Sequence, residues 1–226
     1  IFPKAVEIFQ INTDAWQQAL LTDPATKLDP ILDSARSLYG TYSKTMSVYN
    51  LPFNLMIPLT ACIVPAVSAA LTKKDKVGAG KIAESALRVG AMLALPAGIG
   101  LTVLAGPIIQ LLYPETNQEV GTQCLMVLGI ASIFVCIMLL CNAILQANGR
   151  TALPIWFIAI GSAIKLGVNF VLVQMPSVGI KGAPVGTLVC FGIVSVLELA
   201  AIKRVTPHPP KYLRVFGKAA VAAVLM

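Results

Sequence analysis

The sequence predicts an all-α fold, a polytopic bundle of transmembrane helices. Of its 226 residues, 57% are hydrophobic and only 12% are charged, whereas a soluble domain carries about 25% charged residues. The mean hydropathy is +0.80, and the apolar residues gather into five long runs with most of the charges between them. These runs are apolar on every side, whereas the strands of a membrane β-barrel alternate apolar and polar residues. Lipid is therefore the solvent that fits this chain, and helices are the elements that cross it.

Each of the five apolar runs is long enough to cross about 30 Å of hydrocarbon as a helix. We predict full spans at about residues 45–72, 87–113, 120–148, 151–175 and 182–202. Only one charged residue, Lys165, lies near the middle of a span.

The two ends of the chain are expected to hold partial spans. Residues 1–21 contain three charged residues, and we interpret them as the outer part of a span whose beginning is missing. Residues 22–44 carry two prolines and balanced charge, and we expect them to form an outer loop. Residues 212–226 start a further apolar run. The sequence therefore predicts a single membrane domain that is a fragment of a larger protein.

The charges of the loops predict the topology, because cations retained in short loops mark the cytoplasmic side of a membrane protein. Basic loops at residues 73–88, 149–150 and 203–218 alternate with acidic or nearly neutral loops at 115–119 and 176–181. Five consecutive spans require this alternation, so the three basic loops are expected in the cytoplasm. The net charge of +7 is thereby explained by topology, and nucleic acid is not a predicted partner.

The sequence lacks the patterns of an enzyme or a metal protein. Its five cysteines all lie inside apolar runs without forming a CxxC pair, and we expect them to pack as small apolar residues. The single histidine, His208, stands in a proline-rich loop. No Ser/His/Asp set, phosphate-binding loop or metal-spaced cluster is present. We therefore predict no catalytic activity, no cofactor and no metal site.

Lys165 is the leading candidate for a functional residue. A lone ammonium at membrane depth costs roughly 2.5–3.5 kcal/mol, so such a residue usually faces a wet cavity or a partner. Asn169 follows four residues later, on the same face of a helix. A cation at this depth favours an anionic cargo such as a phosphate or pyrophosphate headgroup. The alternative is a structural ion pair or a carbonyl cap, but the obvious partner, Glu198, is on the order of 10 Å away in depth.

Other polar and small residues also recur at helical spacing. Asn50 and Asn54 lie near the outer end of their span, and Asn142 and Gln146 near the inner end of theirs. These amides are expected either to form interhelical hydrogen bonds or to line a cavity. Small residues recur every four positions at Gly90, Ala94 and Gly98 and again at Gly182 and Gly186, a spacing that lets helix backbones approach closely.

Several short motifs, in this order, resemble the MVIN/stage V sporulation protein B-like polysaccharide transporters of the multidrug/oligosaccharidyl-lipid/polysaccharide flippase superfamily. The motifs lie at residues 38–44, 50–52, 64–68, 144–150, 164–169 and 179–187. The resemblance implies about fourteen helices in two lobes around a central cavity, with this fragment forming most of the C-terminal lobe. It also implies a bacterial plasma membrane, a lipid-linked sugar as substrate, and the missing N-terminal lobe and membrane lipids as partners.

The same resemblance implies which residues face the cavity. Lys165 and Asn169 match a Lys and an Asn of the family, and Lys44, Asn50, Asn54 and Asn142 complete the candidate set. The lipid II flippase branch carries an Arg about one turn before the position of Pro52. Here Ser47 or Val48 stands there and Lys44 is the nearest cation, which favours a more general polysaccharide exporter.

The implied function is the flipping of lipid-linked oligosaccharides by alternating access, from the cytoplasmic to the outer leaflet. Two alternatives remain at this stage. A cation-coupled drug exporter of the related MATE type would need an acidic site within the membrane, and a non-transporting scaffold for envelope or spore assembly would need no site at all.

Overall fold

In the computed structural model the described residues are 24–174 and 182–205, with side chains described for 36–172 and 182–204. These residues form six helices: α3 (Pro24–Thr72), α4 (Lys76–Val103), α5 (Ala105–Leu112), α6 (Gln118–Ala147), α7 (Ala152–Gln174) and α8 (Gly182–Val205). Five of the six are long and apolar enough to cross a membrane. The predicted all-α bundle with five spans is confirmed, and the partial spans expected at 1–21 and 212–226 lie outside the described residues.

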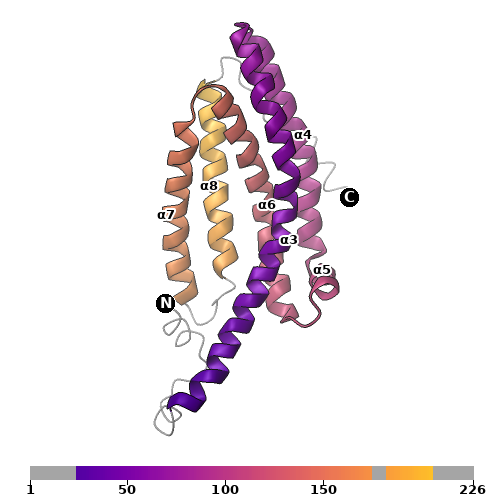
Figure 1. Ribbon diagram of the computed structural model, residues 1–226, viewed down its shortest axis with the longest axis vertical. Coiled ribbons are helices and arrows are strands. Elements are labelled where there is room, and N and C mark those ends of the chain that lie inside the picture. Colours follow the sequence, from indigo (N-terminus) through magenta and orange to yellow (C-terminus); the bar gives the residue numbers. More distant parts are fainter. Residues whose placement is uncertain (1–23, 175–181, 206–226) are drawn as a thin grey trace.

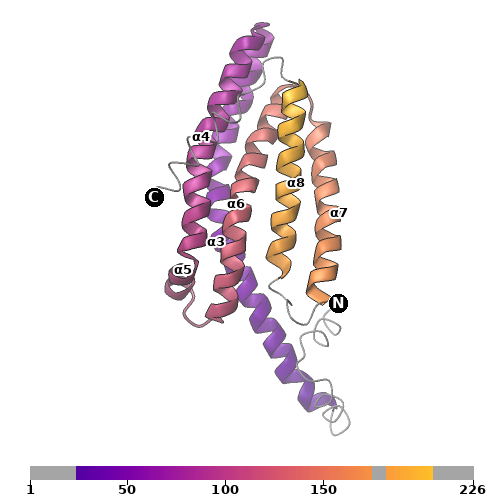
Figure 2. The ribbon, with the colours of Figure 1, turned by 180° about the vertical axis from the view of Figure 1, so that it is seen from behind.

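α6 is the central helix of the bundle and packs against α3, α4, α5 and α8. Figures 1 and 2 show it between the α3–α4 pair on one side and the α7–α8 pair on the other. Its sequence suits this position, because after Glu119 it has no charged residue and small residues such as Gly121, Gly129 and Ala131 admit its neighbours. α7 lies at the edge and packs mainly on α8.

α3 is much longer than the predicted span, and the outer loop expected at residues 22–44 is wrong. The helix begins at Pro24, and its 49 residues reach about 74 Å at 1.5 Å per residue. Thr41, in the expected loop, and Thr45, at the start of the predicted span, are both buried, and their hydroxyls donate to the carbonyls of Ser37 and Thr41. These bonds satisfy the threonines within the helix, so α3 continues past the apolar run and leaves the bundle at an angle (Figure 1).

The span predicted at residues 87–113 is two helices rather than one. α4 ends at Val103 and α5 begins at Ala105, with Leu104 between them. Pro107 explains the break, because its ring would clash with the carbonyl four residues earlier, that of Val103, and it has no N–H to donate. α4 also begins earlier than predicted, at Lys76, where the Asp75 side chain accepts a hydrogen bond from the Gly78 N–H.

Small residues bring α4 and α6 together, which confirms the packing predicted from their spacing. A Cβ at Gly98 would lie 2.8 Å from the Gly129 carbonyl oxygen, and one at Gly129 would lie 3.0 Å from the Gly98 carbonyl oxygen. The two backbones are therefore in direct contact. Thr102 stabilises the same helix–helix contact, since its hydroxyl can donate to the carbonyls of Gly98 in α4 (2.8 Å) and Met126 in α6 (3.3 Å).

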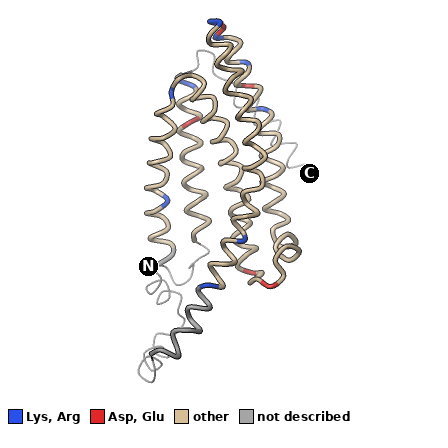
Figure 3. Tube along the Cα trace, viewed as in Figure 1, with Lys and Arg blue, Asp and Glu red and all other residues tan. Residues whose placement is uncertain are grey.

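The basic segments lie at one end of the bundle. Figure 3 shows most Lys and Arg residues where α3 meets α4, where α6 meets α7 and where α8 ends. We call this the basic end and define it by Lys73, Lys74, Arg150, Lys203 and Arg204. Alternating spans with cytoplasmic basic loops require this arrangement.

Candidate functional site

Lys165 lies on the side of α7 that packs against α8. Its side chain is partly buried, and its Nζ lies 6.0 Å from the centroid of the Phe191 ring, within the range of a cation–π contact. It forms no ion pair with any described residue. The structural ion pair with Glu198 is therefore absent, because neither carboxylate oxygen of Glu198 has a hydrogen-bond partner in the described part of the chain.

Asn169 lies one turn further along the same face of α7. It packs against Gly186 of α8, where any Cβ would collide with the Asn169 side chain. The Asn169 Oδ1 atom is buried and has no hydrogen-bond partner among the described residues. By contrast, Leu166 and Phe170, on the other side of α7, are 72% and 69% exposed. The polar face of α7 thus turns inward and its apolar face outward.

α3 brings two tyrosines to the same part of α8. Tyr42 is within hydrogen-bonding reach of Thr187. Tyr49 is buried in an apolar cluster that Phe191 packs against, and its hydroxyl has no hydrogen-bond partner in the described residues. Five polar side chains from three helices therefore gather around the N-terminal half of α8. We call them the α8 polar cluster: Tyr42, Tyr49, Lys165, Asn169 and Thr187.

The sequence predicted only two members of this cluster. Tyr42 and Thr187 stand in motifs of the family resemblance, at residues 38–44 and 179–187, without being singled out. The two tyrosines are seven residues apart, which places them on one face of a helix, and this spacing was the available signal. Nothing in the local sequence indicates that side chains of α3 and α8 meet where both helices pack on α6.

Asn50 and Asn54 lie on an uncovered face of α3, away from the α8 polar cluster. Both are exposed, as are Ser43 and Ser47, and the spacings of four, three and four residues align them along one stripe of the helix. We call these four residues the α3 polar stripe. Polar residues in membrane spans almost always face protein or water rather than lipid. We therefore expect water or another protein surface, rather than lipid, to cover this stripe.

The other two predicted residues lie elsewhere. Lys44 is exposed, and its Nζ lies 5.5 Å from the centroid of the Tyr113 ring at the end of α5. Asn142 is on α6, towards the basic end, with a buried Oδ1 that has no hydrogen-bond partner among described residues. The six predicted residues thus occupy four places: Lys165 and Asn169 share the α8 polar cluster, and Asn50 and Asn54 share the α3 polar stripe. Lys44 and Asn142 each lie apart from the others.

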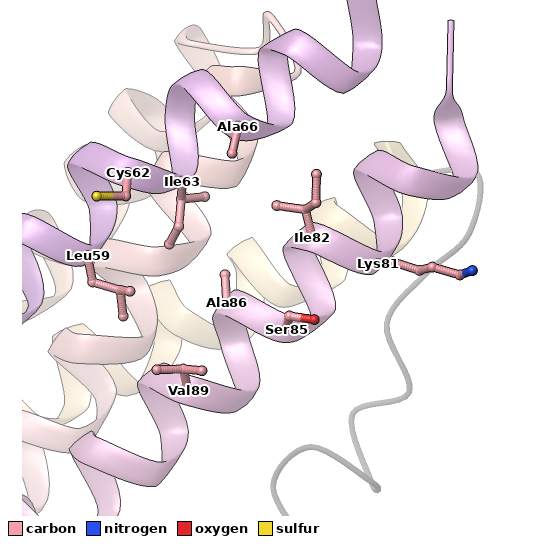
Figure 4. A pocket seen from close by; sticks show the side chains of 9 residues that line it. All are labelled: Leu59, Cys62, Ile63, Ala66, Lys81, Ile82, Ser85, Ala86 and Val89. Atoms are coloured by element: carbon pink, nitrogen blue, oxygen red, sulfur yellow. The ribbon is translucent and has the colours of Figure 1, made fainter. Parts of the chain in front are cut away.

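A groove of about 390 Å³ runs between α3 and α4. Figure 4 shows its lining, which is apolar apart from Cys62, Lys81 and Ser85. None of the six predicted residues lines this groove. Its apolar walls fit an acyl chain better than a sugar.

Accessibility to water can test the α3 polar stripe. We expect single cysteines introduced as Ser47→Cys, Asn50→Cys and Asn54→Cys in the full-length protein, in a Cys62→Ser background, to react with a membrane-impermeant thiol reagent. Leu51→Cys and Leu55→Cys are matched controls, because Leu51 and Leu55 are 56% and 70% exposed but stand beside the stripe. Equal labelling of the stripe and control positions would contradict the prediction that water reaches this face of α3.

A family model described as "Lipid II flippase MurJ" matches residues 32–226. Three curated proteins are similar to the chain. "Uncharacterized membrane protein YabM" of Bacillus subtilis (strain 168) is 29% identical over 173 residues, which cover 76% of this chain and 31% of that protein. "Probable lipid II flippase MurJ" of Rickettsia prowazekii (strain Madrid E) is 27% identical over 148 residues, covering 62% and 28%. "Stage V sporulation protein B" of Bacillus subtilis (strain 168) is 26% identical over 178 residues, covering 77% and 33%.

The fold is also similar to that of a solved structure titled "Inward-facing conformation of a multidrug resistance MATE family transporter of the MOP superfamily". The TM-score is 0.61 at 17% sequence identity, and the match covers 83% of this chain and 48% of that one. At this identity the likeness concerns the fold alone. The chain spans about a third of the length of the curated relatives it matches. Because the family model covers well over half of the chain, this multi-pass membrane protein belongs to the MurJ lipid II flippase family.

Proposed function

We propose that the protein containing this chain flips a lipid-linked oligosaccharide or polysaccharide precursor across the bacterial plasma membrane by alternating access. In this proposal the chain contributes most of one lobe, and the loops at the basic end lie in the cytoplasm. The family and the relative named as a probable lipid II flippase support a cargo of this class.

The observation that carries the proposal is the environment of Lys165. Its ammonium lies 6.0 Å from the centroid of an aromatic ring, without a carboxylate partner among the described residues. Asn169, one turn further along the same face of α7, has a buried amide oxygen that is unpartnered in the described residues. A cation held in this way keeps its charge available for an anionic group. At an effective dielectric constant of 20, opposite charges 4 Å apart attract by about 4 kcal/mol. The pyrophosphate of a lipid-linked sugar presents such charges, whereas a cationic drug would be repelled.

Reconstitution of the full-length protein in liposomes tests this function. The liposomes carry a fluorescent undecaprenyl-pyrophosphate sugar, and a membrane-impermeant reductant quenches the label in the outer leaflet. We expect the quenched fraction to rise faster than in liposomes holding an unrelated helical membrane protein. Equal rates would contradict flipping and favour a scaffold. Export of a cationic dye without flipping of the sugar would instead favour a drug exporter.

A further inference from the structure

The groove between α3 and α4 is open along its length on the surface that the described helices present. Its floor holds one buried residue from each helix, Ile63 of α3 and Ala86 of α4. Ala66 and Ser85 line it from exposed positions, and Figure 4 shows how short these two side chains are. Short residues over an apolar floor leave a hollow of about 390 Å³, which a flexible hydrocarbon chain can enter from the side.

The length and place of the groove match one leaflet of a bilayer. Along α4 its lining runs from Lys81 to Val89, a rise of about 12 Å at 1.5 Å per residue. One leaflet contributes about half of the roughly 30 Å of hydrocarbon. Lys81 lies close to the start of α4 at Lys76, so the groove starts near the basic end and runs towards the middle of the bundle. With that end in the cytoplasm, as proposed above, the groove lies in the inner leaflet.

Positive charge gathers where the groove starts. Lys81 lines the groove, is exposed and forms no ion pair with any described residue. Lys73, Lys74 and Lys76 are exposed as well, at the tip of the α3–α4 hairpin. Lysines at the cytoplasmic surface of a membrane attract anionic lipids, and basic pockets between transmembrane helices on that side bind anionic headgroups.

Two acidic residues lie in the same stretch of chain, and both are engaged within α4. The Asp75 side chain accepts a hydrogen bond from the Gly78 N–H at the start of the helix. Glu84 pairs with Arg88 at 3.0 Å, one turn further along. Neither carboxylate pairs with Lys81, so the ammonium at the end of the groove is left for an anion from outside the chain.

We propose that the α3–α4 groove binds an anionic phospholipid of the inner leaflet, with one acyl chain along its apolar walls and the phosphate at Lys81. Ser85 lies one turn deeper on the same face of α4, where its hydroxyl can donate to an ester carbonyl of the lipid. A zwitterionic phospholipid binds less well, because its own cation meets the same lysines. This lipid is bound and not transported, so the inference goes beyond the proposed function and holds for any cargo.

Photocrosslinking of the full-length protein in liposomes tests the site. Liposomes of phosphatidylcholine contain a trace of photoactivatable phosphatidylglycerol or phosphatidylcholine, each with a diazirine on one acyl chain. We expect mass spectrometry to find several times more phosphatidylglycerol than phosphatidylcholine adducts on residues 59–66 and 81–89. Lys81→Gln should lower the phosphatidylglycerol adducts there about fivefold, the equivalent of about 1 kcal/mol for one lysine near an anionic surface. The phosphatidylcholine adducts should not change.

Two pairs of variants separate charge from shape. Lys203→Gln is the control for Lys81→Gln, because it removes an exposed cation of the basic end from α8, which does not line the groove. Ser85→Phe should lower the adducts of both lipids, since the ring fills the groove from an exposed position. Val77→Phe adds the same ring to α4 at a position that is 46% exposed and outside the groove, and should change neither. The comparison of the two lipids uses the unmodified protein, so a variant that fails to fold does not obscure it.

Three results would overturn the proposal. Equal adducts of the two lipids, unaffected by Lys81→Gln, would mean that the groove holds lipid without regard to charge. No adduct on either segment would mean that another part of the whole protein covers the groove. Loss of the phosphatidylglycerol adducts on adding an undecaprenyl-pyrophosphate sugar would mean that the groove holds the tail of the cargo.

Discussion

Replacing Gly129 with alanine is expected to destabilise the bundle by about 1–3 kcal/mol, the usual cost of overpacking a well-packed interior. The added Cβ would lie 2.8 Å from the Thr102 amide nitrogen and 3.0 Å from the Gly98 carbonyl oxygen. Both atoms belong to the backbone of α4, so a side-chain rotation cannot relieve the clash. α4 and α6 must move apart, which also breaks the hydrogen bond from the Thr102 hydroxyl to the Met126 carbonyl. Gly98→Leu should have a larger effect, because a bulkier group meets the Gly129 carbonyl.

Thermal unfolding of the purified full-length protein, followed by size-exclusion chromatography after heating, measures this effect. Gly100→Ala is the matched control, since Gly100 is on the same helix as Gly98 and a Cβ there meets nothing within 4 Å. That variant should be as stable as the original protein or more stable by about 0.5–1 kcal/mol, because alanine loses less backbone entropy in a helix than glycine. If Gly129→Ala and Gly100→Ala unfold at the same temperature, the two helices are not held by backbone contact.

The fold class could be predicted because it depends on composition and run length, which are local. The close approach of α4 to α6 could be predicted for the face of α4 but not for the face of α6. Gly90, Ala94 and Gly98 recur every four residues and identify the face of α4. In α6, Gly121 and Gly129 are eight residues apart with Leu125 between them, so the four-residue repeat of small residues is broken on the face that carries Gly129.

The length of α3 could not be predicted from hydropathy. Two prolines and balanced charge at residues 22–44 give its N-terminal part the composition of a loop. The Thr41 hydroxyl in this segment nevertheless donates to a carbonyl of the same helix.

The candidate site, like the fold, could be predicted only in part from the sequence. Lys165 and Asn169 share a helical face by simple periodicity, so their proximity was predictable. Tyr42 and Thr187 are 145 residues apart in the chain (187 − 42) and become neighbours only when α3 and α8 both pack on α6. Asn50 and Asn54 were open to two interpretations, interhelical hydrogen bonding or cavity lining. Their exposure shows that no described helix covers them, and that information exists only in three dimensions.

Replacing Lys165 with methionine is expected to change transport and stability in opposite directions. Methionine keeps the length of the side chain and removes its charge, so the roughly 2.5–3.5 kcal/mol cost of a cation at membrane depth disappears. The variant should therefore be inserted and folded at least as well as the original protein. If the ammonium attracts the anionic headgroup, losing even about 1.4 kcal/mol of that attraction lowers flipping about tenfold. Lys165→Arg keeps the charge and should retain much of the activity.

Flipping rates in liposomes and the unfolding temperature of the same preparations measure the two effects together. Lys203→Met is the matched control, because it removes a cation by the same substitution from an exposed position at the basic end, and its flipping rate should be unchanged. A purely structural lysine would behave differently: Lys165→Met would lower stability and transport in parallel. Unchanged flipping at unchanged protein levels would remove Lys165 from the transport mechanism, since its charge would then act on nothing that moves.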